Sequence, residues 1–591
     1  MTNPTIHAAP PRNRILLLCL VPPVLTALVV AIFGVDVLYW DEWMIWTKLL
    51  PPLKDKTLAL SHIVAQQNEQ RNAAARVFGL LFLPFFKLNR FPEFYTILAL
   101  NAVSFASLVG LYRRTTAYYR LEDRPWIIVA FSCLIFSLAQ WQVFTFGVNT
   151  SVVLPIACLC VSLYLLADRR LPAWKFLLLA AIGYIGSFNF ANGLFNWFCL
   201  IPSLLCVETR RVRKPLVILL WLLVAASAWG LYFYHYTKPG HHPSLLYMFE
   251  HPFITIGFLL AYLGAPLADQ CLPYPVALVF GLGGLAALAH ALVQLRQLPR
   301  ERLMGLAPWF ALLVFACLTA GATCVGRVGF GIQQQALQSR YIAFSTLFWI
   351  SLLVVATCAE RLAPLPSGQR TRRLKMGFII ACAGMFLLTN GLDIIVLRNR
   401  EIKFTKARRE LFRLVDDASL KRIFPDPHYL KSQLHFFFQE RLSNFRNFRE
   451  LGDYRLAQGQ GGVIESIEII PANSPDSPSG VLLRGWAKDP APGADRPADY
   501  LLIANRGKLV YAGVTGDERT STDPASSLRL AGFTLFLPSG FFSERDVTLE
   551  AYSLSRDGLT IARLDTVTPA ALSLPEPSFP AFIVDKHFFS P

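Results

Sequence analysis

Long apolar runs separated by short polar segments dominate the first 392 residues. About 20 apolar residues cross the core of a bilayer, and eleven runs approach that length. The runs are 15–35, 94–112, 126–141, 151–167, 175–188, 193–207, 216–234, 274–294, 305–323, 341–358 and 375–392. This pattern predicts an α-helical polytopic membrane domain over residues 1–392 with about eleven transmembrane helices.

Basic residues gather in alternate short loops of this domain. Arg and Lys cluster in the loops 113–124, 169–175, 210–214, 296–302 and 361–375. By the positive-inside rule these loops and the N-terminus are cytoplasmic. Counting the apolar run 252–268 as a span would move the 296–302 loop to the other side, so we interpret it as a re-entrant or interfacial hairpin. The first run follows Arg12 and Arg14 and has no convincing cleavage site, which predicts a retained helix.

The pattern changes after residue 392, and parity places everything beyond it on the outer face. Residues 393–458 are strongly charged and are predicted to form a helical connector. From residue 459 to 591, short alternating runs are separated by turn clusters such as 473–478, which predicts a β-sandwich. Trp486 in this region is a candidate stacking platform for a sugar, although such a residue more often belongs to a core.

Composition agrees with a membrane protein and excludes several other classes. The 591 residues are 54% hydrophobic and only 16% charged, against about 25% charged in soluble domains. The net charge of +17 could suggest nucleic acid, but the basic residues of the membrane domain follow the loops, so no nucleic-acid partner is expected. The 11 Cys residues precede residue 383 and lack metal-ligand spacing, which favours small core residues over disulfides.

The longest loop between spans, residues 36–93, holds the first candidate chemistry. Asp41 and Glu42 stand between Trp40 and Trp43, and a polar run from Gln66 to Arg71 is predicted to lie on an amphipathic helix. One interpretation is an aromatic belt with acids that face water. The other makes Asp41 a general base with Glu42 in support, beside indole faces that suit a sugar ring. The candidate catalytic residues are Asp41 and Glu42, and the candidate substrate-binding residues are Trp40, Trp43, Asn68, Glu69 and Arg71.

The outer loop near 326–341 carries two arginines against the charge bias of the short outer loops. Arg327 and Arg340 could snorkel to lipid head groups. Alternatively, their guanidinium groups, with Tyr341, bind a donor phosphate, because a planar fork of donors can hold two oxygens at once. A metal is a further alternative, because Asp41, Glu42 and Glu69 could hold a hard divalent cation through oxygen ligands.

These residues together resemble the polytopic glycosyltransferases of the GT-C superfamily. The resemblance covers residues 15–392 and rests on Asp41-Glu42 after the first span, Asn68-Glu69-Gln70-Arg71, and Ser339-Arg340-Tyr341 at the start of a late span. It implies inverting transfer from a polyprenyl-phosphate-linked sugar to a glycan or glycolipid acceptor outside the cytoplasm, in a bacterial inner membrane. Asp41 would be the base and Arg340 the donor-phosphate ligand. Family members often show His where Gln67 and Gln70 stand.

Two alternatives remain open at this level. A transporter or flippase of glycolipid or polysaccharide is expected to place charges or broken helices near the middle of the membrane. A glycan polymerase or ligase could also use outer-loop arginines and a periplasmic tail. The acids and unusual arginines of this chain lie at the predicted outer surface, which favours the glycosyltransferase.

Overall fold

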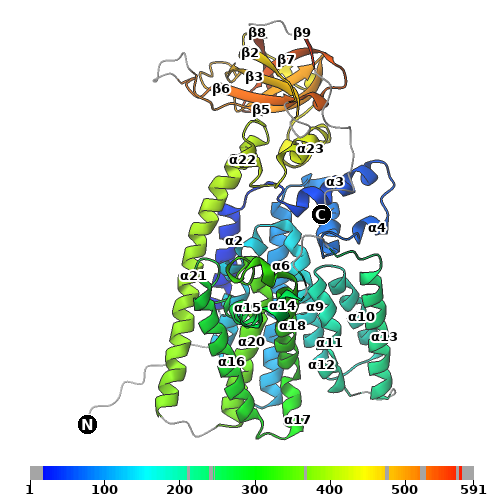
Figure 1. The fold of residues 1–591 in the computed structure, drawn as a ribbon, viewed down its shortest axis with the longest axis vertical. Helices are drawn as coiled ribbons and strands as arrows, with labels where there is room; N and C mark the ends of the chain where they lie inside the picture. The colour runs from blue at the N-terminus through cyan, green and yellow to red at the C-terminus, as the bar shows by residue number, and fades with distance from the viewer. Residues whose placement is uncertain are drawn as a thin grey trace, which may run out of the picture.

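The computed structural model describes residues 17–208, 213–238, 244, 246–364, 369–472, 478–519, 527–566 and 571–574. Arg12, Arg14, Arg210, Arg211 and residues 473–477 of the predicted turn lie outside these ranges. The described chain forms a long helical bundle with a β-rich domain at one end, and a smaller helical layer lies between the two (Figure 1). We call the end of the bundle that faces this domain the β-domain end, and the opposite one the far end.

Among the described residues, the bundle contains eight segments that are long and apolar enough to cross a membrane, in agreement with the predicted multi-pass membrane protein. They are α6 (Phe91–Tyr118), α7–η2–α8 (Pro125–Ile135, Leu138–Gln140, Trp141–Phe144), η3–α9 (Gly147–Asn149, Thr150–Leu166), α13 (Lys214–Phe233), α16 (Tyr274–Leu295), α17–η5–α18–η6 (Arg300–Leu303, Met304–Leu306, Ala307–Arg327, Val328–Phe330), α20 (Ser339–Leu362) and α21 (Gln369–Glu410). Several of these helices begin with Pro in the first turn, where its missing N–H costs no hydrogen bond.

Shorter apolar helices complete the bundle. They are η1–α2 (Leu18–Leu20, Val21–Phe33), α5 (Ala73–Phe86), α10 (Ala173–Ser187), η4–α11–α12 (Ala191–Phe195, Asn196–Cys199, Ile201–Leu205) and α15 (Pro252–Gly264). The predicted spans 15–35, 175–188 and 193–207 fall on this shorter class, so the count of eleven crossings stays a prediction. Short helices α3 (Asp41–Lys54), α4 (Leu60–Ile63), α14 (Tyr247–Glu250) and α19 (Ile332–Gln335) lie in the connections.

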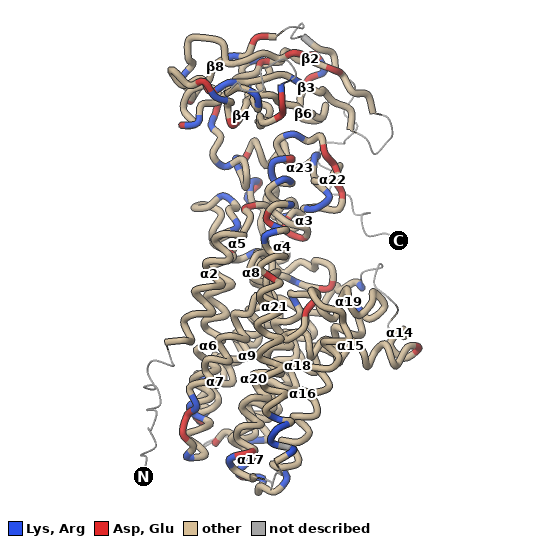
Figure 2. Tube along the Cα trace, turned by 90° about the vertical axis from the view of Figure 1, so that its left-hand side faces the viewer, with Lys and Arg blue, Asp and Glu red and all other residues tan. Residues whose placement is uncertain are grey.

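The basic loops meet at the far end, as their alternation along the chain predicts. The hydroxyl groups of Tyr118 and Tyr119 donate to backbone oxygens of Glu301 and Arg302, and Arg361 donates to the backbone oxygen of Glu122. Figure 2 shows Lys and Arg at this end and long uncharged stretches above it. The 296–302 loop therefore shares an end with the 113–124 loop, which leaves no crossing for the run 252–268. Its helix α15 has 13 residues and belongs to the shorter apolar helices.

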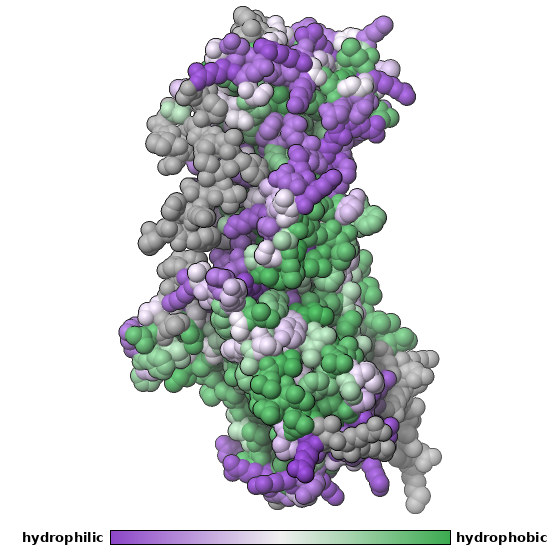
Figure 3. All heavy atoms as spheres, turned by 90° about the vertical axis from the view of Figure 1, so that its right-hand side faces the viewer, coloured by the Kyte–Doolittle hydropathy of each residue, from purple (hydrophilic) through white to green (hydrophobic). Residues whose placement is uncertain are grey.

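Hydrophobic side chains cover the outside of the bundle. Figure 3 shows a broad hydrophobic band between hydrophilic surfaces at the far end and on the β-rich domain. Large apolar side chains on the long helices, such as Leu223, Val279 and Ile380, are exposed. Exposed apolar surface of this extent is what lipid would cover.

Helix α21 runs without a break from the bundle to the smaller helical layer beneath the β-rich domain. It has 42 residues and passes through the predicted domain boundary at 392/393, because a charged sequence can continue a helix that an apolar one begins. After it come α22 (Asp417–Leu420), α23 (Pro427–Gln439), η7 (Ser443–Phe445) and η8 (Leu451–Asp453). The predicted connector is thus helical, but its first part belongs to the last long helix of the bundle.

The C-terminal part is β-rich, as predicted. Its strands are β1 (Arg455–Leu456), β2 (Gly462–Ile470), β3 (Gly480–Ala487), β4 (Tyr500–Asn505), β5 (Lys508–Val514), β6 (Gly532–Pro538), β7 (Asp546–Leu554), β8 (Thr560–Thr566) and β9 (Ala571–Ser573), with η9 (Ser539–Phe541) after β6. Seven of them follow one hydrogen-bonded order, β5-β4-β7-β8-β2-β3-β6, while β1 pairs with β8 and β9 pairs with β7. Strand β8 joins the two halves by pairing antiparallel with β7 and parallel with β2, so the halves of the predicted sandwich are one continuous sheet.

One apolar core holds the first loop, the connector and the β-rich domain together. It includes Trp43 and Trp46 of α3, Phe437 of α23 and Tyr511 of β5. Polar contacts add to it: Thr47 and Tyr429 hydroxyls lie 2.7 Å apart, and Arg446 pairs with Asp36 at 2.5 Å. The first loop is therefore clamped beneath the connector.

Candidate functional site

A cavity of about 150 Å³ lies at the β-domain end, beneath α3. It collects residues from four distant parts of the chain: the first loop, the segment around η3, Phe190, and the start and end of the late outer loop. Its lining residues are Trp40, Asp41, Gln67, Asn68, Glu69, Gln70, Asn72, Phe146, Val148, Asn149, Val152, Phe190, Arg327, Arg340 and Tyr341. Seven of the ten predicted site residues are among them, namely Trp40, Asp41, Asn68, Glu69, Arg327, Arg340 and Tyr341.

Asp41 is the first residue of α3, and its carboxyl group faces the cavity. Trp40 precedes it with a φ of 46°, a conformation held by the backbone hydrogen bond from Trp40 N to the Ile423 oxygen at 2.8 Å. The amide of Asn68 donates to Asp41 Oδ1 at 3.2 Å. Burial raises the pKa of Asp41, and the positive charge of Arg340 acts in the opposite direction. A carboxylate with a raised pKa is better matched to accept a proton near neutral pH.

The polar run 66–71 forms a tight turn, so the predicted amphipathic helix is wrong. Gln67 and Gln70 bond each other through their backbones, N to O, at 2.7 and 3.0 Å. Asn68 and Asn72 have φ values of 51° and 48°, in the left-handed region that Asn tolerates better than most residues. The turn directs Asn68 and Glu69 into the cavity.

Two arginines from the late loop meet these acids. Arg327, at the end of α18, forms an ion pair with Glu69 of the turn. Arg340, in the first turn of α20, packs over the ring of Tyr341 at 5.1 Å, and its buried Nε has no hydrogen-bond partner. The structure thus brings together a carboxylate and two guanidinium groups that the sequence separates by nearly 300 residues.

Glu42 lies outside the cavity, in a buried ion cluster. Arg90 donates to Glu42 Oε1 at 2.6 Å and to Glu93 Oε1 at 2.9 Å, and these three side chains are at most 3% exposed. The backbone N–H groups of Tyr39 and Val148 also donate to Glu42, at 2.9 and 3.2 Å. Glu42 therefore holds α3 in place and does not face the substrate space assigned to it from the sequence.

Gly147 lets the backbone before Val148 lie directly on this cluster. A Cβ atom there would come within 2.0 Å of Glu93 Oε2 and 2.3 Å of Arg90 Nη2. We expect G147A to lower the free energy of unfolding by about 1–3 kcal/mol, the usual cost of overpacking. Urea unfolding in detergent measures it. G230A is the control, because no atom lies within 4 Å of the place that its Cβ would take on α13 and Ala favours a helix; equal losses in both variants would contradict the prediction.

Trp43 and Arg71 also lie outside the cavity lining. The indole N–H of Trp43 donates to the Leu38 oxygen at 2.9 Å, and its ring lies 5.0 Å from that of Phe437, so it packs α3 against α23. The guanidinium of Arg71 donates to the backbone oxygens of Tyr232 and Tyr234, which fixes the turn to the end of α13. Both residues support the site from behind, and their assignment as substrate ligands is not supported.

Several lining residues were missed from the sequence. Gln67, Gln70, Asn72 and Asn149 add amide groups, while Phe146, Val148, Val152 and Phe190 form an apolar wall. Gln70 Oε1 accepts a hydrogen bond from Ala191 N at 2.5 Å, and buried Gln67 Oε1 has no partner. For Phe146, Val148, Asn149 and Phe190, the signal that could have found them is the polarity of the connections 142–149 and 188–192, which interrupt apolar runs on the same side as the first loop.

The alternative of a divalent cation held by Asp41, Glu42 and Glu69 meets two acids that are already paired with arginines in this arrangement. Glu42 is paired with Arg90, and Glu69 is paired with Arg327. Within the described part of the chain, three close metal-ligating side chains occur elsewhere, at Asp269, Cys271 and Asp393.

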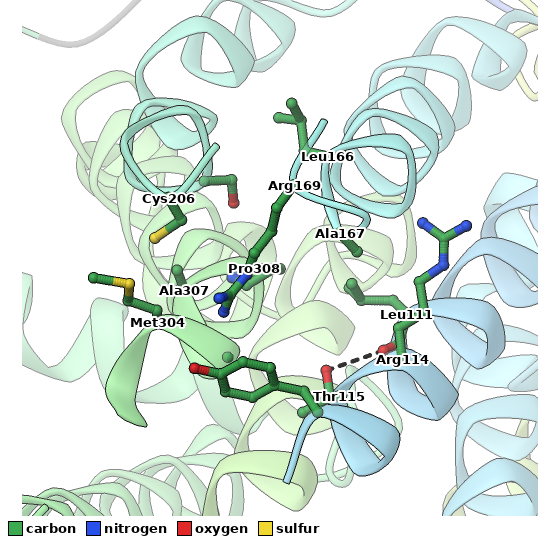
Figure 4. Close-up of a pocket in the computed structure, with 13 residues that line it drawn as sticks. Leu111, Arg114, Thr115, Leu166, Ala167, Arg169, Cys206, Met304, Ala307 and Pro308 are labelled. Atoms are coloured by element: carbon green, nitrogen blue, oxygen red, sulfur yellow. Dashed lines mark hydrogen bonds between the residues drawn. The ribbon is translucent and has the colours of Figure 1, made fainter. Parts of the chain in front are cut away.

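A second pocket lies at the far end and carries a different set of groups. Its lining includes Thr115, Tyr118, Arg169 and Pro308, and Figure 4 shows Arg169 reaching across it towards Pro308. Arg114 donates to the backbone oxygen of Tyr164 at 2.7 Å. No acidic side chain is among its lining residues, so it lacks the base that the cavity beneath α3 offers.

The chain was compared with protein-family models, curated proteins and solved structures, and none of the three comparisons finds a match.

Proposed function

We propose that the protein is a glycosyltransferase that moves a sugar from a polyprenyl-phosphate donor to a glycan or glycolipid acceptor. One observation carries the proposal: a single cavity holds the Asp41 carboxylate, the Arg340 and Arg327 guanidinium groups and the half-exposed indole of Trp40. In this proposal the carboxylate accepts a proton, the two guanidinium groups bind the phosphate, and the indole offers a face for a sugar ring. These are the groups that the transfer requires.

The proposed reaction is one displacement. The acceptor hydroxyl attacks the anomeric carbon, its proton passes to Asp41, and the bond to the donor phosphate breaks with inversion. Arg340 stabilises the negative charge on the departing lipid phosphate. Its unpaired buried Nε leaves a donor to offer, whereas Arg327 is already paired with Glu69 and would contribute mainly charge.

The same proposal sets the orientation. The far end carries the basic loops, so it faces the cytoplasm, and the cavity and β-rich domain face the outside of a bacterial inner membrane. Soluble nucleotide sugars are then out of reach, and a donor must arrive in the membrane. The proposed eleven crossings are the eight long segments together with η1–α2, α10 and η4–α12.

The test compares envelope glycans and glycolipids of cells with and without the gene by mass spectrometry. Loss of one sugar residue from an otherwise intact glycan, restored by the wild-type gene, supports the proposal. An unaltered glycan that accumulates inside the cell would indicate a flippase. Loss of whole glycan chains from their acceptor would indicate a ligase, and either result would overturn the proposed transfer.

Arg340→Gln should affect both donor use and pH dependence. Losing a charge-assisted hydrogen bond costs about 1.5–3 kcal/mol, so the donor KM should rise by about 10- to 100-fold. Asp41 must be ionised to act, so the rate should fall at acid pH with an inflection above the ordinary Asp value of about 3.9. Because Arg340 lowers the pKa of Asp41, R340Q should move this inflection to higher pH. Steady-state kinetics across pH measures both effects; an unchanged KM and pH profile would make Arg340 an interfacial anchor.

A further inference from the structure

Three metal-ligating side chains meet where the loop after α15 touches α21. The candidate ligand atoms of Asp269, Cys271 and Asp393 all lie within 4.8 Å of one another. Cys271 Sγ is 3.5 Å from Asp393 Oδ1, and the backbone N–H of Cys271 donates to Asp269 Oδ1 at 3.0 Å. None of the three lines the cavity beneath α3.

The two carboxyl groups are buried, and only one oxygen of each has a hydrogen-bond donor. Asp269 and Asp393 are both 0% exposed, and Oδ2 of each is buried without a hydrogen-bond donor. Among the described residues, no Lys, Arg or His forms an ion pair with either carboxyl group. Two like charges in a buried site are strongly unfavourable, so a positive species must accompany them or a proton must neutralise one.

We propose that Asp269, Cys271 and Asp393 bind a divalent metal ion of the zinc class. Two carboxylate oxygens and a thiolate are ligands that zinc accepts, whereas a thiolate disfavours magnesium and calcium. The unpartnered oxygens supply the negative charge, and the metal displaces the thiol proton and any proton held by the carboxyl pair. The inference does not depend on the glycosyltransferase proposal.

The metal would fasten the loop 265–273 to α21. Gln333 of α19 holds the same loop: its Nε2 donates to the Leu272 oxygen at 3.0 Å, and its Oε1 accepts from Tyr274 N at 2.7 Å. Helix α19 lies between Arg327 and Arg340 in the chain, so the metal would also restrain the segment that carries both arginines.

The test measures zinc bound to the purified full-length protein in detergent after removal of loosely bound metal. Elemental analysis should find about one zinc per wild-type chain and almost none in D393N. Cobalt loaded in place of zinc should give a thiolate-to-metal absorption band that disappears in C271S. C317S is the matched control, because Cys317 is exposed on α18 and should leave zinc content and the cobalt band unchanged.

Two results would overturn the metal site. One is zinc content that is equal in wild type and D393N, which would place the metal elsewhere. The other is a wild-type chain that takes up neither zinc nor cobalt, together with a higher Tm for D393N than for wild type. That result would assign a shared proton to the carboxyl pair. C271S differs from wild type by one atom, so its cobalt spectrum remains decisive if D393N fails to fold.

Discussion

Asp41→Asn should reduce sugar transfer by about 10²- to 10⁴-fold while leaving the protein folded. A positioned general base contributes about this factor, which corresponds to about 3–5 kcal/mol in the activation barrier. The amide keeps an oxygen that can accept the hydrogen bond from Asn68, and it removes a carboxylate whose pKa burial raises. Transfer from a synthetic polyprenyl-phosphate sugar by detergent-purified enzyme gives the rate.

The control for this variant is Asp55→Asn. Asp55 is the C-terminal cap of the same helix, α3, and is exposed, so D55N changes the same chemical group outside the cavity. We expect D55N to retain the wild-type rate. Wild-type transfer by a well-folded D41N enzyme would remove Asp41 as the base, and an equal loss in D55N would show a general effect on α3.

Arg90→Met should lower the free energy of unfolding by about 3–5 kcal/mol, the cost of removing one partner from a buried ion pair. Glu42 and Glu93 would face each other at 3% side-chain exposure without their cation. The loss should shrink as pH falls. Burial already raises the pKa of Glu42, and without Arg90 it rises further. The folded variant therefore takes up protons at a pH where the unfolded chain has released them, so stability is gained as pH falls through that pKa.

The control replaces an exposed ion pair in the same way. Arg506 and Glu544, on the β-rich domain, are 55% and 54% exposed, so R506M should change stability by less than about 1 kcal/mol. A triple replacement of Arg90, Glu42 and Glu93 by Met should recover much of the loss, since it leaves no unpaired charge. Chemical unfolding in detergent measures all three variants. Equal stability of R90M and wild type at neutral pH would refute the structural role of the cluster.

The bundle could largely be predicted from the sequence because a bilayer limits the length of an apolar helix and the side on which basic loops lie. Run length identified the long helices, and loop charge located the 296–302 loop at the far end, which in turn excluded a crossing by 252–268. The break placed at residue 392 was less successful. It marks where α21 stops being apolar, whereas the helix itself continues to Glu410 and α22 follows only at Asp417.

The site was predicted in part, and its errors have identifiable causes. Arg340 stood out because a charge at the start of a span is costly, and Asp41 because of its aromatic neighbours. Neighbours on a helix point in different directions, and in α3 Asp41 faces the cavity while Glu42 points to Arg90. The choice between them depends on Arg90 and Glu93, which lie far along the chain. The turn at 67–70 depends on backbone pairing that polar composition does not reveal.

The unbroken course of α21 makes the β-rich domain the end of a lever. A 42-residue helix is about 63 Å long, and about 30 Å of that suffices to cross a bilayer core. The remaining half carries the domain, with Arg413 of the segment after the helix paired to Asp517 at 2.9 Å. Tilting the helix by about 10° would swing its upper end sideways by about 5 Å. A sideways displacement of the domain would therefore also move the part of α21 where Asp393 meets the loop after α15.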